Sequence, residues 1–501
     1  MSIYEPNPTR SGPDTALDAA TLETGSGLRG RMGPMLLAFM VLACVSPLTG
    51  AAGYIGLGIT VGNGIGMPLM YLVGGVVLMI FSVGYVGLIR RIARPGGFYA
   101  YLTAGLGKRI GLGGAFLTVT IYTLTTVGLI TFCGITLSDT VATTFHGPHI
   151  QWWIGALPFL AVSAVLSYFN VAVSARFLCV VLVLEVAVVL VFDFVVAQRG
   201  GQSGISADSF TYSSLMSGTT ALAFLYAISA YTGFESTALY YEEVRDPQRT
   251  LPRATYAVVV VIALFYTITG WMLITAFGSR NAVEAISSDY STAFGRAVGI
   301  YLGTAMHDVV NVMLFTGLLA SLLSSNNLIA RYAFSFGVDR VTPAYFGHAH
   351  PKHGSPARAS VLVHGMLFVA ILLLAVTGTT ANDIFALTAS AGMYGFLILF
   401  FLVSIAIVAY FFRNPESTAA GRIATFVCPV ISTVIFAVAT VYVAKNFSLI
   451  IGDEPVLTAL LQIILYTSFV VGVAYASYLA VNRKNVFARL GRTDFDSEVS
   501  S

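Results

Sequence analysis

Two stretches of the chain combine Ser, Thr and Gly with a residue that disfavours a regular helix, inside otherwise apolar surroundings. One is Ser46–Gly50 (Ser-Pro-Leu-Thr-Gly), and the other is Ser229–Gly233 (Ser-Ala-Tyr-Thr-Gly), which Phe234 and Glu235 follow. An interrupted helix exposes N–H groups that suit an anion and carbonyl groups that suit a cation. In hydrocarbon such a break survives only where it is buried in protein or lines a polar cavity. The pair therefore predicts a transporter's substrate site.

The chemistry of that site follows from its residue types. Hydroxyl groups supply hydrogen-bond donors and acceptors, and Tyr231 and Phe234 supply an apolar or cation–π wall. The predicted substrate-binding residues are Ser46, Thr49, Gly50, Ala51, Ser229, Tyr231, Thr232, Gly233, Phe234 and Glu235. The alternative is that Pro47 kinks a structural helix whose hydroxyls bond back to their own turn. Two breaks at corresponding positions favour the binding site over that alternative.

Two carboxylates lie within apolar runs. Glu185 stands among Val and Leu, where hydrocarbon disfavours its charge, so we predict that it takes up and releases a coupling proton. The alternative is a protonated structural acid bonded to a neighbouring carbonyl. Glu235 has two interpretations: it binds a substrate amine, or it holds the break open by accepting bonds from freed N–H groups.

A polar stripe in the run 302–337 offers a second candidate for ion coupling. It contains Ser321, Ser324, Ser325, Asn326 and Asn327. Ser324 and Ser325 could form an ion site against the first helix, or the stripe could hydrogen-bond neighbouring helices. The four cysteines lie in apolar runs without metal-ligand spacing, so no metal and no cofactor are predicted.

Composition and hydropathy indicate an all-α integral membrane protein. The 501 residues are 56% hydrophobic and 10% charged, with a mean hydropathy of +0.82. Apolar runs of membrane length predict about twelve spans. Their cores are 34–61 (broken), 68–93, 112–139, 152–169, 177–197, 215–242 (broken), 254–277, 302–337, 359–377, 384–412, 424–444 and 456–480.

The distribution of basic residues predicts the orientation. If the N-terminus is cytoplasmic, every one of the 26 Lys and Arg residues except Arg199, Arg280, Arg296 and Lys445 falls in a cytoplasmic segment. This bias predicts a multi-pass protein of the plasma membrane with both termini in the cytoplasm. The basic residues form no single stripe, which argues against a nucleic-acid partner.

Three motifs resemble the amino acid–polyamine–organocation (APC) superfamily of permeases. Gly233–Ser236 and Glu242–Ala254 resemble its sixth helix and following loop, Arg331–Ser335 to Pro356 its loop after helix 8, and Gly96–Tyr101 its segment before helix 3. The first break is similar to the putrescine-importer-like branch rather than to the commoner Gly-Ser-Gly pattern. Some members carry a Lys in helix 5 where this chain has Glu185.

The resemblance implies a leucine-transporter-like fold, with two inverted five-helix repeats followed by two helices. The expected organisation is a disordered tail (1–30), a first repeat (31–200, with helix 1 broken at 46–53), a second repeat (201–415, with helix 6 broken at 229–235), helices 11 and 12 (416–482) and a C-terminal tail (483–501). The substrate is then expected between the unwound parts of helices 1 and 6.

These features predict a secondary active transporter, not an enzyme. We expect it to import amino acids by alternating access, coupled to protons in preference to sodium, with the lipid bilayer as its surroundings. A polyamine or amine permease, or an exchanger of the same fold, is the alternative. A channel would need a continuous polar stripe, and a transporter-like sensor would carry a soluble output domain, so both are less favoured.

Overall fold

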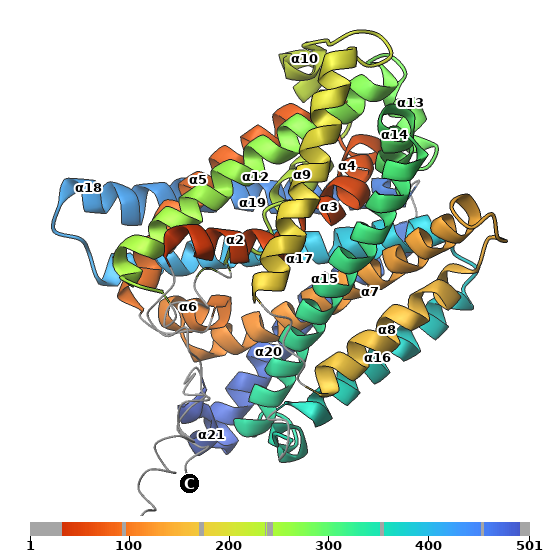
Figure 1. The fold of residues 1–501 in the computed structure, drawn as a ribbon. Coiled ribbons are helices and arrows are strands. Elements are labelled where there is room, and N and C mark those ends of the chain that lie inside the picture. Colours follow the sequence, from red (N-terminus) through yellow and green to blue (C-terminus); the bar gives the residue numbers. More distant parts are fainter. Residues whose placement is uncertain are drawn as a thin grey trace, which may run out of the picture.

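The chain folds into a bundle of long helices that cross one another at steep angles (Figure 1). The computed structural model describes residues 33–92, 97–169, 175–235, 237, 244–350, 355–451 and 455–490. The expected tail 1–30 lies outside these residues, as do residues 491–501 of the second tail.

The principal helices follow the predicted spans in order. They are α2 (Pro34–Val45), α3 (Pro47–Thr49), the π-helix η1 (Gly50–Tyr54), α4 (Ile55–Val61), α5 (Met67–Arg91), α7 (Lys108–Thr143), α8 (Trp152–Tyr168), α9 (Ala175–Arg199), α11 (Thr220–Ser229), α12 (Pro247–Phe277), α15 (Thr304–Val338), α16 (Ala357–Ala375), α17 (Ala381–Arg413), the π-helix η6 (Ile423–Val427), α19 (Cys428–Asn446) and α20 (Pro455–Asn482).

The membrane character of the fold is confirmed. Within the described part of the chain, nine helices are long and apolar enough to cross a membrane. Shorter apolar helices at 47–61, 152–168 and 220–229 supply the remaining predicted spans, and two of these belong to the interrupted segments. The protein is therefore an all-helical, multi-pass membrane protein, as its sequence predicts.

Several shorter helices lie between or beyond the cores of the predicted spans. They are α6 (Gly97–Leu106), α10 (Tyr212–Leu215), α13 (Ala282–Ser287), α14 (Ala293–Leu302), α18 (Ala419–Arg422) and α21 (Lys484–Arg489). α14 buries an apolar face that includes Phe294 and Val298, and it contacts η1, α9 and α15. The predicted tail 483–501 thus begins with a helix, because Leu490 packs with residues of α7 and α20.

The helix contacts repeat with an offset of five spans. α5 packs on α12, α7 on α15 and α8 on α16, and α4 of the first interrupted helix contacts α11 of the second, so four helices of the first five meet their counterparts among the next five. The first interrupted helix contacts α12 and α9 through α2, and the second contacts α5 and α17 through α11. This pattern is the one expected of two inverted repeats, whose boundaries stay a prediction.

A buried polar network ties three helices together. The Nδ1–H of His364 in α16 donates to the carbonyl of Ser360 at 2.8 Å, which leaves Nε2 as an acceptor. Ser163 of α8 and Asn326 of α15 each lie 3.2 Å from that Nε2, and the Asn326 amide also donates to the Ser163 hydroxyl at 2.9 Å. Asn326 of the polar stripe therefore serves helix–helix bonding.

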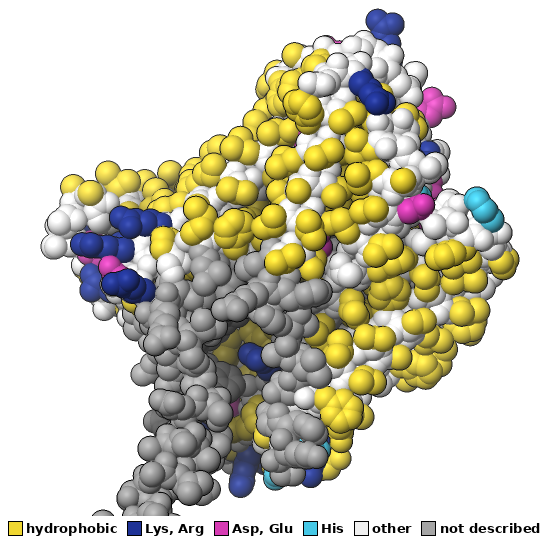
Figure 2. Space-filling view, viewed as in Figure 1, with side chains coloured by type: hydrophobic (Ala, Val, Ile, Leu, Met, Phe, Trp, Pro, Cys, Tyr) yellow, Lys and Arg dark blue, Asp and Glu magenta, His cyan; other side chains and the backbone are white. Residues whose placement is uncertain are grey.

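The outer surface matches a protein held in a bilayer. Figure 2 shows hydrophobic side chains spread over the sides of the long helices, with Lys and Arg gathered near the end that carries α18 and α21. Basic side chains also stand at the opposite end, near α10 and α13. The orientation in the membrane follows from the positive-inside bias and stays a prediction.

The predicted topology can be tested by cysteine labelling on intact cells. On a background without the native cysteines, Arg280→Cys and Lys445→Cys should react with an impermeant thiol reagent, because both positions are exposed on the predicted outer side. Arg249→Cys and Arg358→Cys, also exposed, should react only after permeabilisation. Outside labelling of all four positions would contradict the predicted orientation.

Candidate functional site

The first helix is interrupted at Ser46. Its backbone has φ 49° and ψ 75°, a left-handed conformation that is uncommon for any residue except glycine. Pro47 follows at the start of α3, where its missing N–H removes one group that would otherwise need a partner. The Ser46 hydroxyl donates to Thr49 Oγ1 at 2.9 Å, so the two predicted hydroxyls of this break bond each other.

A carboxylate from another helix satisfies the backbone freed by this break. Glu185 of α9 is 3% exposed, and its carboxylate accepts a hydrogen bond from the N–H of Leu48. Gly317 of α15 lies against the same carboxylate: a Cβ on Gly317 would come within 2.5 Å of Glu185 Oε1 and 3.3 Å of Ser46 Oγ. Glu185, Ser46 and Gly317 thus lie close together. This position allows Glu185 to respond to a change in the conformation of the first break.

In the second interrupted helix, a carboxylate of the same segment accepts a backbone N–H that the break has freed. α11 ends at Ser229, and Gly233 has φ 109°, a conformation that favours glycine. Glu235 Oε2 accepts the N–H of Gly233 at 2.8 Å. The hydroxyls of Tyr85 and Tyr122 reach Glu235 as well, at 3.0 Å to its carbonyl and 3.4 Å to Oε1. In this conformation Glu235 accepts a freed N–H of the break, which corresponds to the interpretation that it holds the break open.

The other predicted substrate residues differ in how accessible they are. Tyr231 and Phe234 are fully buried: the Tyr231 hydroxyl donates to the carbonyl of Tyr71 at 2.8 Å, and Phe234 packs on rings of α5 and α17. Ala51 is also fully buried, and Ser229 donates to the carbonyl of Leu225 at 2.6 Å. Thr232 and Gly233 are partly exposed. The region is packed in this conformation, with Thr232 and Gly233 on its accessible side.

Tyr266, Tyr71 and Tyr231 connect the first break to the second. Of these, Tyr266 of α12 was not predicted as a site residue from the sequence. Its hydroxyl lies so close to Gly50 that a Cβ there could not be accommodated. The Tyr266 ring stacks on Tyr71 of α5, with centroids 5.6 Å apart, and Tyr71 in turn accepts the bond from Tyr231. Tyrosine is an ordinary residue in an apolar helix, so only its position between the breaks identifies Tyr266.

The predicted ion-coupling serines lie away from this junction. Ser324 is exposed and Ser325 partly exposed on α15, about two helical turns beyond Gly317. Gly317 is the residue through which α15 approaches Glu185. An ion site that combines Ser324 or Ser325 with the first break stays a prediction without support from this geometry, whereas Glu185 lies at the break itself.

Comparisons with known proteins agree with the architecture. A family model described as amino acid permease matches residues 35–477. A low-affinity putrescine importer of Escherichia coli (strain K12) is 23% identical over 358 residues, which cover 69% of this chain and 73% of the relative. A methylthioribose transporter of Bacillus subtilis is 24% identical over 284 residues, 55% of this chain and 56% of its own.

A plant relative covers a shorter part of the chain. Cationic amino acid transporter 7 of Arabidopsis thaliana is 29% identical over 182 residues, 36% of this chain and 28% of the relative. The names of these relatives refer to an amine, to amino acids and to a thiosugar, so similarity alone assigns no substrate to this chain.

Gly233 can be tested with a matched glycine. Gly233→Ala should lower the free energy of unfolding by about 1 kcal/mol or more, because an L residue is strained at positive φ. Gly365→Ala, in α16 with no atom near a new Cβ, should leave stability unchanged or raise it. Thermal unfolding of both purified variants measures the difference. Equal melting temperatures would show that the turn at Gly233 is not strained as described.

Proposed function

This chain belongs to the amino acid permease family, and we propose that it is a secondary active transporter that imports amino acids across the plasma membrane by alternating access. It is a multi-pass membrane transporter rather than an enzyme. What supports the mechanism is that both interrupted helices occur at equivalent places in the repeated contact pattern, and that each has a freed N–H bonded to a buried carboxylate.

The proposed site suits a zwitterion. The half-helix after the first break begins at Pro47, and its first N–H groups, those of Leu48 and Thr49, lie at the positive end of the dipole, which favours a substrate carboxylate. The carbonyl end of α11 at Ser229 favours a substrate amine. Ser46, Thr232 and Tyr266 add hydroxyls, while Tyr231 and Phe234 close the apolar wall behind them. A small amino acid would use both kinds of backbone end at once.

An amine or a polyamine is the second candidate substrate. Glu185 and Glu235 place two carboxylates at the breaks, and a cation could exchange with the N–H groups that they now accept. The resemblance of the first break to the putrescine-importer-like branch favours the same class. A diamine would need both carboxylates ionised, whereas an amino acid needs neither.

Glu185 is the proposed coupling residue, with a proton as the coupling ion. Its hydrogen bond from the Leu48 N–H is strong while the carboxylate is charged and weaker once it is protonated. Protonation would therefore loosen the connection between α9 and the first break, and deprotonation would restore it. Such a link between charge and helix position is what proton-driven alternating access requires.

The substrate proposal is tested by thermal stability and by uptake. Purified protein should be stabilised by amino acids, because a ligand that binds only the folded state raises apparent stability, and proteoliposomes should accumulate the same compounds. Putrescine serves as the competing ligand. Stabilisation and uptake with putrescine but with no amino acid would replace the first proposal by the second. Neither response, in protein that is folded, would contradict both.

The coupling proposal predicts that Glu185→Gln keeps substrate binding and loses the dependence of uptake on outer pH, because Gln cannot exchange a proton. Asp193→Asn is the matched control: Asp193 is buried on the same helix, but it bonds Thr269 at 3.0 Å instead of the break. Uptake into proteoliposomes across a pH series, with and without a sodium gradient, measures the effect. An unchanged pH profile for Glu185→Gln, or wild-type uptake that follows sodium alone, would overturn it.

A further inference from the structure

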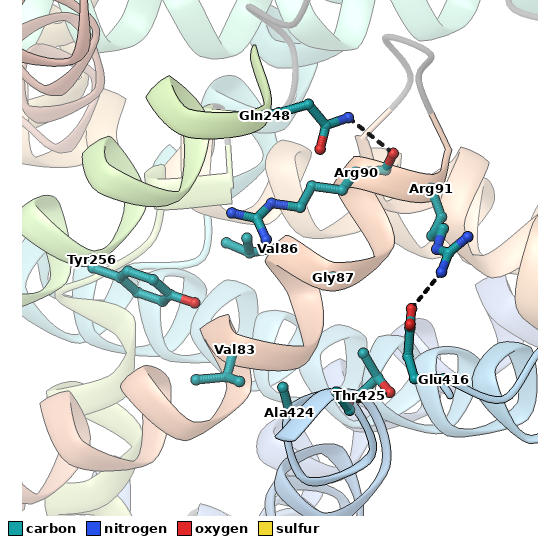
Figure 3. Close-up of a pocket in the computed structure, with 11 residues that line it drawn as sticks. Val83, Val86, Gly87, Arg90, Arg91, Gln248, Tyr256, Glu416, Ala424 and Thr425 are labelled. Atoms are coloured by element: carbon teal, nitrogen blue, oxygen red, sulfur yellow. Dashed lines mark hydrogen bonds and ion pairs between the residues drawn. The ribbon is translucent and has the colours of Figure 1, made fainter. Parts of the chain in front are cut away.

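A pocket of about 500 Å³ opens where α5, α12 and the α18–η6 segment meet, and no residue of either break lines it. Its walls combine apolar side chains with a few polar ones (Figure 3). The lining includes Val83, Val86 and Ala424 on the apolar side, and Arg90 and Tyr256 on the polar side. It lies at the end of the molecule where basic side chains gather, which is the proposed cytoplasmic end.

Among the charged side chains that line the pocket in the described part of the chain, two pair with each other and Arg90 is left. The guanidinium of Arg91 is 2.6 Å from the carboxylate of Glu416, so these two charges compensate each other. The Arg90 side chain extends along the pocket toward Val86 and Tyr256 (Figure 3), and within the described part of the chain it makes no ion pair. Gln248 bonds the Arg90 carbonyl at 3.4 Å and leaves the guanidinium available. The pocket therefore carries a net positive charge.

The pocket continues into surface that is suited to hydrocarbon chains. Four and eight residues beyond Tyr256 on α12, Val260 and Leu264 are 47% and 51% exposed, so an apolar stripe leads away from the pocket on the same side of that helix. Ile423 and Val427 of η6, which flank the lining residues Ala424 and Thr425 in the chain, are 56% and 44% exposed. A positively charged hollow with apolar surface on both sides matches a molecule with an anionic head and long apolar tails.

We propose that this pocket binds the headgroup phosphate of an anionic phospholipid, with its acyl chains along α12 and η6. Arg90 would bind the phosphate by charge-assisted hydrogen bonds, and the Tyr256 hydroxyl, which points toward the same space, would donate a further bond. Basic pockets between membrane helices at the cytoplasmic side are suited to such headgroups. Free phosphate shares the headgroup chemistry but would gain nothing from the apolar walls.

Native mass spectrometry of the full-length protein titrated with phosphatidylglycerol tests the proposal. Arg90→Gln should weaken the tightest lipid-binding event by about fivefold, the factor expected for one basic residue at a lipid surface. Arg90→Lys should recover most of the affinity, because it restores the charge. Arg253→Gln is the matched control: it removes the same charge from the cytoplasmic end of α12 but does not line the pocket, and it should bind as the wild type does.

The outcomes separate lipid from other sources of binding. Phosphatidylcholine, which has the phosphate but no net charge, should bind more weakly than phosphatidylglycerol, and inorganic phosphate at equal concentration should not displace the lipid. An equal loss in Arg90→Gln and Arg253→Gln would reduce the effect to general surface charge and overturn the proposal. Displacement of the lipid by inorganic phosphate would identify the pocket as a free-anion site and overturn it too.

Discussion

A backbone N–H without a partner inside the membrane is the constraint on which this structure depends. Each interrupted helix frees such groups, and a buried carboxylate accepts one at each break: Glu185 for Leu48 and Glu235 for Gly233. The two acids stabilise a geometry that hydrocarbon alone would not allow. The same bonds make the breaks sensitive to charge, because an ionised carboxylate is a better acceptor than a protonated one.

The two breaks are also joined to each other by packing. Tyr266 lies against Gly50, stacks on Tyr71, and through Tyr71 reaches Tyr231. A movement of α12 would therefore displace residues at both breaks, since a close-packed interior transmits displacement. The contact between Gly50 and Tyr266 also explains why a small residue is needed at that position of the first break.

The sequence predicted the membrane-spanning helices and their interruptions better than the contacts between distant helices. Long apolar runs, and the paired Ser-x-x-Thr-Gly stretches, were enough to locate the spans and both breaks, because these signals are local. The bond from Leu48 to Glu185 and the approach of Gly317 depend on how distant helices pack, which no local pattern records. For the same reason the full burial of Phe234, and the helix α14 between two predicted spans, could not be derived from the sequence.

The network of Ser163, Asn326 and His364 sets a mechanical boundary within the molecule. Sliding α8, α15 and α16 past one another would strand three polar groups in an apolar interior, which costs far more than sliding purely apolar faces. These helices should therefore travel as a single body. Any hinge must lie elsewhere, such as at the two interrupted helices, so the membrane domain divides into a group of helices that moves together and a part that can change shape.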